Sequence, residues 1–98
     1  MAGTNLLKKA EKPCRCMSAL ASPLRMAIII ALKDGELSVN DIISKVEGSQ
    51  SSVSQNLGTM KDRGLVKARR EGNMIYYSLV NPKIIKLLDL MEELFCSN

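Results

Sequence analysis

The sequence predicts a small, mostly α-helical domain with a single β-hairpin, and three observations predict it. The chain has 98 residues, which is the usual length of one domain. Only 3% of the residues are aromatic although 46% are hydrophobic, so the core has to be built from aliphatic side chains and methionine, as is typical of packed helices. Apolar residues recur at helical spacing along most of the chain and alternate with polar ones mainly between residues 65 and 80.

The first predicted element is a short helix that follows a polar N-terminal arm, residues 1–12. Pro13 suits the first helical position, because the N–H that proline lacks is not needed there. The arm, MAGTNLLKKAEK, is weakly patterned and is either a frayed segment or a helical extension. Ser22-Pro23 repeats the pattern of a helix start and opens an apolar helix that Gly35 ends. Residues 13–98 are therefore expected to form one domain.

Two helices joined by a tight turn are predicted next. The first is a short amphipathic helix over residues 36–46. Its apolar face consists of Val39, Ile42, Ile43 and Val46. Glu47-Gly48 breaks this helix, and Ser49 is the predicted N-cap of the next one, which covers residues 50–63 before Gly64. The inward face of that helix consists of Val53, Leu57 and Met60.

The C-terminal third predicts a β-hairpin and a last helix. LVKARR and MIYYSLV, separated by EGN, alternate as strands do, so either Tyr76 or Tyr77 should pack inward. Asn81-Pro82 opens a helix through about Phe95 whose apolar arc is too wide for a small domain to cover alone. We interpret it as a dimer interface; the alternative is that it folds onto its own core. The order of elements describes a winged helix-turn-helix that is dimeric through its first and last helices.

The second helix of this motif carries an outward face that suits DNA. Its side chains are Gln50, Ser51, Ser52, Ser54 and Gln55, and no acid precedes Asp62. Glutamine can pair bidentately with adenine, serine can bond base edges or phosphates, and a helix N-terminus favours phosphate. The alternative is an ordinary polar surface, but such surfaces usually carry Glu–Lys pairs.

Positive charge flanks that helix. Basic residues crowd the segment from Lys61 to Arg70, and Asp62 is the only acid within it. The hairpin tip, Arg70-Glu71-Gly72-Asn73, could follow the DNA backbone or enter a minor groove. The flanking candidates for DNA contact are Lys61, Arg69, Arg70 and Asn73. A net charge of +4 and a pI of about 9.1 permit an anionic partner without proving one.

Several classes of protein are disfavoured. The chain has no histidine and no clustered nucleophile and base, so we expect no enzyme. No apolar run is long enough to span a membrane and no apolar signal segment is present, which predicts a cytoplasmic protein with reduced thiols and no membrane partner. A winged-helix protein-interaction module without DNA binding remains an alternative.

The segments ALASPLRMAIIIAL, GELSVNDI and SQSSVSQNLGTMKDRGLVKARREGNMIYYSL together resemble the ArsR/SmtB family of dimeric winged-helix repressors. The resemblance covers roughly residues 17–95 and is strongest in the helix, the RGLV link and the wing. It implies a homodimer that binds imperfect palindromes in double-stranded DNA and leaves them when an inducer binds or a thiol reacts. Gln50, Ser51, Ser52, Ser54 and Gln55 match the positions that read DNA in that family.

The resemblance also directs attention to metals and thiols. Both common family metal sites are missing, because there is no histidine for a site in the last helix and ELSVNDI has no thiol. The remaining candidate ligands and sensor thiols are Cys14, Cys16 and Cys96. Residues two apart in a helix point about 200° away from each other, so Cys14 and Cys16 can share a ligand only in a non-helical chain. Their place near the predicted helix start favours the thiolate form.

Three hypotheses about these thiols remain open. In the family dimer the first and last helices pack together, which could bring Cys14 or Cys16 near Cys96 of the same or the other subunit. Cys96 resembles the C-terminal cysteine of the thiol-sensing branch, although the position that matches its partner is Ile29 here, so Cys16 would have to substitute. Redox or sulfide chemistry is the favoured signal, and binding of arsenic or another thiophilic ion by all three thiols is the alternative. The third hypothesis is that Cys16 is a small apolar residue with no sensing role.

Overall fold

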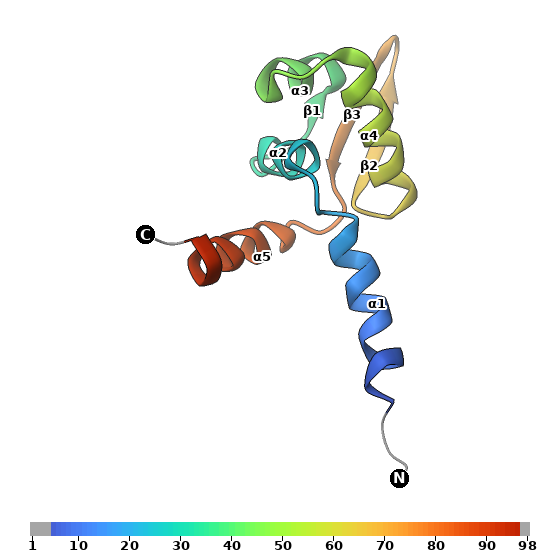
Figure 1. Cartoon of the computed structure of the whole chain (residues 1–98). Helices are drawn as coiled ribbons and strands as arrows, with labels where there is room; N and C mark the ends of the chain where they lie inside the picture. The colour runs from blue at the N-terminus through green and yellow to red at the C-terminus, as the bar shows by residue number, and fades with distance from the viewer. Residues whose placement is uncertain (1–4, 97–98) are drawn as a thin grey trace.

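The structure is a computed structural model that describes residues 5–96. Within this range it contains five α-helices, a three-stranded sheet and a final π-helical turn (Figure 1). In chain order these are α1 (Leu6–Ser18), α2 (Pro23–Ala31), β1 (Leu37–Ser38), α3 (Val39–Val46), α4 (Gln50–Asp62), β2 (Val66–Glu71), β3 (Met74–Leu79), α5 (Ile84–Met91) and the π-helical turn (Glu92–Cys96). The predicted winged helix-turn-helix is confirmed.

The core lies between α2, α3, α4 and the sheet. Its fully buried side chains are Ile28, Ile29, Leu32, Ile42, Val53, Leu57, Met60 and Val66. The predicted inward face of α4 is confirmed, since Val53 and Met60 are each 0% exposed and Leu57 is 1% exposed. At about 25 cal/mol per Å² of apolar surface, this burial is the main force that holds the helix-turn-helix together.

Serine side chains mark three helix starts. Ser22 Oγ accepts a hydrogen bond from the N–H of Arg25, and Ser49 Oγ accepts one from the N–H of Ser52. Both predicted N-caps are therefore confirmed. Ser38 caps α3 in the same way. Left-handed backbone ends the neighbouring helices, at Glu47 after α3 (φ 54°) and at Gly64 after α4 (φ 77°).

The predicted helix start at Pro13 is wrong. α1 begins at Leu6, where the side chain of Asn5 accepts a hydrogen bond from the N–H of Lys8, and Pro13 lies inside the helix. The helical interpretation of the arm therefore holds for residues 6–12, and residues 1–4 lie outside the described range. The asparagine cap followed by good helix formers outweighs the one backbone hydrogen bond that Pro13 cannot donate.

The sheet contains one strand that the sequence does not predict. Periodicity predicts a helix over residues 36–46, but Leu37–Ser38 form β1, which pairs antiparallel with Tyr77 and Tyr76 of β3. The strand order is β1-β3-β2. β2 and β3 form the expected hairpin, in register from Val66↔Leu79 to Glu71↔Met74, around a turn in which Gly72 has a φ of 61°.

α1 extends away from this body, and α5 runs beside α2 so that a groove separates its outer end from that helix (Figure 1). Apolar side chains are exposed on α1 and on the π-helical turn that follows α5: Leu7 is 83% exposed and Phe95 is 80% exposed. Among residues 5–96, no single helix has the length and apolar character needed to cross a membrane; α1 and α2 meet that criterion only together, as a pair bent by 72°.

Candidate nucleic-acid interface

The outward face of α4 presents the predicted DNA-reading side chains together. Gln50, Ser51, Ser54 and Gln55 are exposed, whereas Ser52 is half-buried. These residues occupy the first turns of the helix, beside the free backbone N–H groups of its N-terminus. A helix start carries a partial positive charge, so this end of α4 is suited to phosphate and to base edges.

The hairpin brings basic residues back to the same end of the molecule. α4 packs against β2, which runs back along it, so the hairpin tip lies level with the beginning of α4 (Figure 1). Arg70 and Asn73 are exposed at this tip. Lys61 is also exposed but lies at the opposite end of α4, so it does not join this group. We name the exposed face of residues 50–55 and the tip residues 70–73 together the polar surface.

Arg69 is engaged within the protein. Its guanidinium donates two hydrogen bonds to Glu36, at 2.9 Å from Nε and 2.7 Å from Nη2, and it also pairs with Glu71. It lies over the ring of Tyr76 at 4.7 Å from the centroid. The hydrogen bond from Arg69 lowers the pKa of the Glu36 carboxyl, and the two carboxylates raise the pKa of Arg69. Arg69 thus ties the wing to the residue that precedes β1.

Arg70, in contrast to Arg69, is not held by other side chains of the described residues. Strand alternation places it on the other face of the hairpin from Arg69, and among residues 5–96 no carboxylate lies within ion-pairing distance of it. Tyr77 packs against the core while Tyr76 faces Arg69, which confirms that one of the two tyrosines points inward. Of the two arginines at the tip, Arg70 is therefore the one available to a phosphate.

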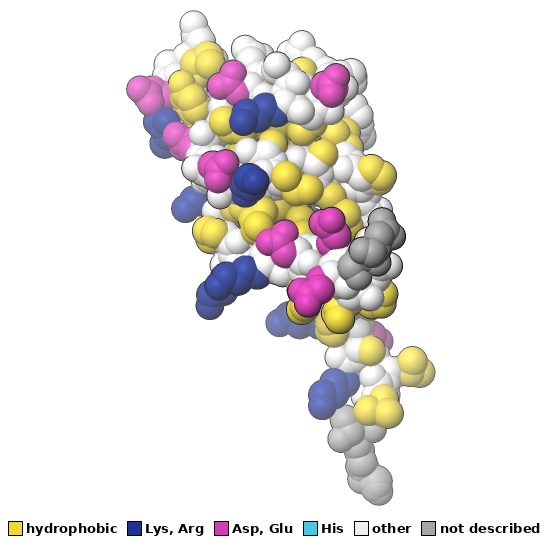
Figure 2. Space-filling model, turned by 90° about the vertical axis from the view of Figure 1, so that its left-hand side faces the viewer, with side chains coloured by type: hydrophobic (Ala, Val, Ile, Leu, Met, Phe, Trp, Pro, Cys, Tyr) yellow, Lys and Arg dark blue, Asp and Glu magenta, His cyan; other side chains and the backbone are white. Residues whose placement is uncertain are grey.

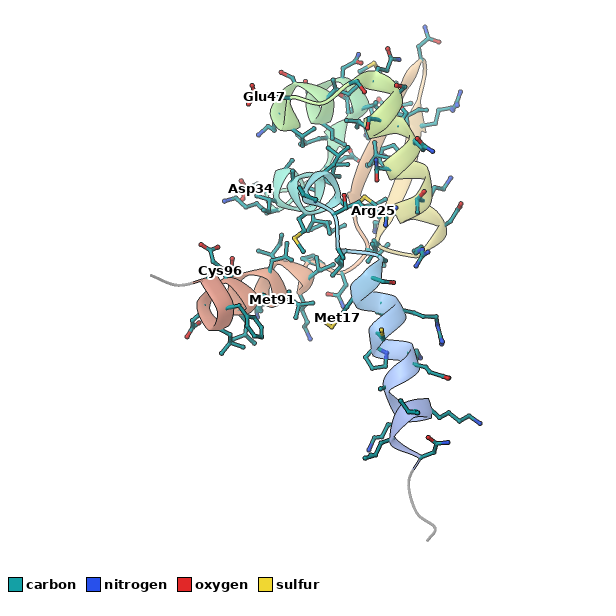
Figure 3. The ribbon with its side chains drawn as sticks, viewed as in Figure 1. Met17, Arg25, Asp34, Glu47, Met91 and Cys96 are labelled. Carbon is teal, nitrogen blue, oxygen red and sulfur yellow. The ribbon has the colours of Figure 1, made fainter. Side chains whose placement is uncertain are left out.

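One pair of polar residues escapes prediction from the sequence. Arg25 of α2 donates from Nε to Oδ1 of Asn56 in α4 at 3.0 Å, and from Nη1 to the carbonyl of Ala19 at 3.2 Å. Figure 3 shows the Arg25 side chain extending from α2 toward α4. The arginine and the asparagine are 31 residues apart. In the sequence, the only local indication of this contact is that each of the two residues is unfavourable at its own position in a helix.

The thiols lie at the other end of the molecule. Cys14, Cys16 and Cys96 are all unbonded and exposed. Cys14 and Cys16 occupy the second half of α1, so the expectation that a helix N-terminus activates them is wrong. Because the segment is helical, their side chains diverge and do not form a two-thiol site of their own.

Two grooves open beside two of these thiols, Cys96 and Cys14. The first, about 620 Å³, lies between α2 and the end of α5 and is lined by Cys96, Ile30, Phe95 and two acids, Asp89 and Glu92. The second, about 560 Å³, lies between α1 and α2 and is lined by Cys14. Met26 and Met91 line both. Figure 2 faces the first groove and shows hydrophobic side chains gathered there beside acidic ones.

Among residues 5–96, side chains of one protomer do not come together as a metal site. In the described residues, no group of three or more His, Cys, Asp or Glu side chains is close enough together to hold a metal ion. Cys14 and Cys96 line different grooves, and Cys16 lines neither of the two. A site for arsenic that uses all three thiols would need a second chain.

Known proteins similar to this chain share one architecture. A family model for the N-terminal domain of the methanogenesis regulatory protein FilR1 matches residues 14–92. The transcriptional activator HlyU of Vibrio cholerae is 34% identical over 89 residues, which are 91% of this chain and 82% of HlyU. The biofilm growth-associated repressor of Agrobacterium fabrum is 32% identical over 90 residues, which are 92% of this chain and 77% of the repressor.

Solved structures agree with these relatives. The homodimeric winged helix-turn-helix DNA-binding domain of Mb0332 from Mycobacterium bovis superimposes with a TM-score of 0.75 at 33% identity. The match covers 96% of this chain and 89% of that domain. The winged helix-turn-helix fold of this chain is thus shared with that DNA-binding domain, at an identity high enough to indicate common descent.

Proposed function

The chain belongs to the ArsR/SmtB family of winged-helix transcriptional regulators, and from this premise we propose that it is a homodimeric repressor that binds operator DNA through the polar surface. The observation that carries the proposal is the outward face of α4. It presents glutamine and serine side chains and no acid at a capped, exposed helix start. That face is too polar to pack inside a protein. Its side chains are short enough to let the helix enter a major groove.

The two parts of the polar surface have different roles in this proposal. Gln50, Ser51, Ser54 and Gln55 read base edges or bond phosphates beside the N-terminus of α4, and a glutamine can specify adenine through two hydrogen bonds. Arg70 neutralises a phosphate at the wing, with Asn73 beside it, and thereby contributes affinity without sequence preference. Ser52 is half-buried and contributes less to direct reading than its neighbours.

Homodimer formation is supported by the end helices. The exposed apolar side chains of α5 and its π-helical turn include Leu87, Leu90, Leu94 and Phe95, and those of α1 include Leu6, Leu7 and Met17. α1 carries four basic residues and one acid, whereas α5 and its π-helical turn carry three acids and one lysine, so the two segments are complementary in charge. A twofold axis through these helices places two α4 helices on one DNA face, which predicts an imperfect palindrome.

Repression rather than activation is the finer part of the proposal. The names of the relatives include both an activator and a repressor. A dimer seated on promoter DNA occludes RNA polymerase without any additional surface. We expect the protein to bind DNA upstream of its own gene and thereby to prevent transcription of that gene.

Thiol chemistry is the proposed release signal. All three cysteines are exposed, and Cys14 and Cys96 line adjoining grooves at the proposed dimer interface. When two thiols form a disulfide, both S–H bonds break, and two protons and two electrons pass to an oxidant such as a peroxide, or to a polysulfide whose S–S bond is thereby reduced; the new S–S bond draws the helices together. Such a bond between end helices would change the spacing of the two α4 helices. Arsenic binding across the two subunits is the alternative.

A gel shift with the DNA upstream of the gene, repeated at several salt concentrations, tests the proposed function. Binding through phosphate contacts requires the logarithm of affinity to fall linearly with the logarithm of salt concentration. If affinity did not depend on salt, the protein would not bind DNA through the proposed phosphate contacts, and a protein-interaction module would be the better interpretation.

A further inference from the structure

The link between α2 and α4 has features that local helix preferences do not explain. Arg25 lies in the first turn of α2, where the helix dipole disfavours a cation. Asn56 lies in the middle of α4, where asparagine is a poor helix former. Each residue is unfavourable at its own position in its helix, and the two are hydrogen-bonded to each other. Such paired exceptions indicate a specific role for the contact.

The contact engages both polar atoms of the Asn56 side chain and two of the three guanidinium nitrogens of Arg25. The Oδ1 of Asn56 accepts from Arg25, and its Nδ2 donates to the carbonyl of Ser52, one turn earlier in α4, at 2.8 Å. The guanidinium of Arg25 also holds the carbonyl of Ala19, the residue that caps the end of α1. The bridge therefore runs from the corner between α1 and α2 to the backbone of α4 behind the DNA-reading residues. Both side chains are half-buried.

The remaining contacts of α4 do not fix its rotation in the same way. Val53, Leu57 and Met60 hold the helix against the core through apolar packing, which is not directional. Hydrogen bonds lose strength steeply when their angle changes, so a bridge to the Asn56 side chain resists rolling of α4 about its axis. A roll of the helix would turn Gln55, the neighbour of Asn56, away from its base.

We propose that Arg25 is a positioning residue for DNA recognition: through Asn56 it fixes the rotation of α4 and so sets sequence preference, without touching DNA itself. The proposal rests on the proposed function, because it assumes that α4 reads bases. It assigns Asn56 to the interior of the protein and not to the set of base-reading side chains. Its expected effect is on the ratio of specific to non-specific binding.

A double-mutant cycle tests this role. Arg25→Met and Asn56→Ala should each lower the ratio of specific to non-specific DNA affinity about tenfold, the change expected for losing one hydrogen bond to a charged group. The double variant should lose no more than either single one, because both remove the same bridge. Lys45→Met is the matched control: it removes the same charge from an exposed position in the last turn of α3 and should leave the ratio unchanged.

Two outcomes would overturn the proposal. If Arg25→Met lowered the slope of affinity against salt by about one, Arg25 would be a phosphate contact. If the two single losses added to about a hundredfold, the residues would act separately. Circular dichroism and sedimentation identify any variant that fails to fold or dimerise. If Arg25→Met fails in this way, Arg25→Lys replaces it in the test. Lysine keeps the charge but not the two-pronged geometry, so Arg25→Lys should show the same loss of the ratio of specific to non-specific affinity.

A spectroscopic readout separates this proposal from the proposed function. In the DNA-free wild-type protein, the Nε–H proton of Arg25 should exchange slowly with solvent, and in Asn56→Ala it should exchange as fast as that of the exposed Arg15. If fast exchange were already seen in the wild type, the bridge would be absent and the proposal wrong. If the wild type showed slow exchange but did not bind DNA, the bridge would exist and the proposed function would be wrong. The role of Arg25 in recognition would then be wrong as well.

Discussion

Arg69 and Arg70 are adjacent in sequence but differ in what they can bind. Arg69 is held by Glu36, Glu71 and the ring of Tyr76, whereas Arg70 has no carboxylate partner among the described residues. The sequence indicates only that one of the two should face DNA. The choice depends on Glu36, which is 33 residues away from Arg69 and is brought close by the pairing of β1 with β3.

Arg70→Ala should weaken binding to all DNA sequences alike, because its proposed contact is with a phosphate. The slope of log affinity against log salt concentration should become shallower by about one, as expected for the loss of one phosphate contact. Fluorescence anisotropy titrations with an operator fragment and an unrelated fragment measure both effects. A loss confined to the operator fragment would show instead that Arg70 reads bases.

The carboxyl group of Glu36 should titrate below the usual range for glutamate as long as Arg69 is present. Since the folded-state pKa is lowered, the ion pair stabilises the wing above the ordinary carboxyl pKa and ceases to do so as the pH falls through the lowered value. Carboxyl-carbon NMR of Arg69→Met should show the pKa of Glu36 raised. Arg63→Met, which removes a charge elsewhere, is the control, and an equal pKa in wild type and Arg69→Met would contradict the pairing.

At the scale of elements, local patterns predict the helices well and the sheet less well. The caps at Ser22 and Ser49 and the stop at Gly64 depend on a few adjacent residues, so the sequence is sufficient to find them. β1 is two residues long, and its pairing partners lie in β3, so no periodicity could indicate it. The cap at Asn5 is visible in the sequence, but the proline within α1 suggests a later start.

Gly48 is predicted to be essential to the turn between α3 and α4, and Gly58 provides a matched control. A Cβ atom at Gly48 would lie 2.9 Å from Cγ2 of the buried Val53, a stiff side chain that cannot move away cheaply. Gly48→Ala should lower the free energy of unfolding by about 1–3 kcal/mol, as overpacking does. A Cβ at Gly58 meets nothing within 4 Å, so Gly58→Ala should raise it by roughly 0.5–1 kcal/mol through helix propensity.

Urea denaturation of the two alanine variants measures these changes directly. The geometry of the turn requires opposite signs for the two substitutions. If Gly48→Ala were as stable as the wild type, the close approach of Gly48 to Val53 would not exist in solution.

At the scale of the whole molecule, the thiols and the polar surface lie at opposite ends. Communication between them therefore has to pass through the end helices and the dimer. The sequence can name the three cysteines, but it cannot show that Cys14 and Cys16 belong to the second half of a longer helix, or that Cys14 and Cys96 line adjoining grooves. These facts depend on how α1 and α5 lie relative to the body.

Cys14→Ser and Cys96→Ser should each keep operator binding while losing release by an oxidant, a sulfide species or arsenite, because these two thiols line the adjoining grooves. The substitution replaces a thiol by a hydroxyl of similar size at an exposed position, so folding should be unaffected. DNA-binding titrations of the reduced, oxidised and arsenite-treated proteins, followed by mass measurement of the thiols, distinguish the signals. Normal release by both variants would show that thiol chemistry at these positions is not the switch.

Selection of bound DNA from a random pool tests the central claim, that two copies of α4 read a sequence in the major groove. The wild type should enrich an imperfect palindrome whose half-sites are about one helical turn, 10–10.5 base pairs, or a multiple of it apart. Gln55→Ala should retain the palindrome but lose preference at one matching position in each half-site. Enrichment of no sequence by the wild type, or an unchanged preference in Gln55→Ala, would contradict the assignment of α4 as the reading helix.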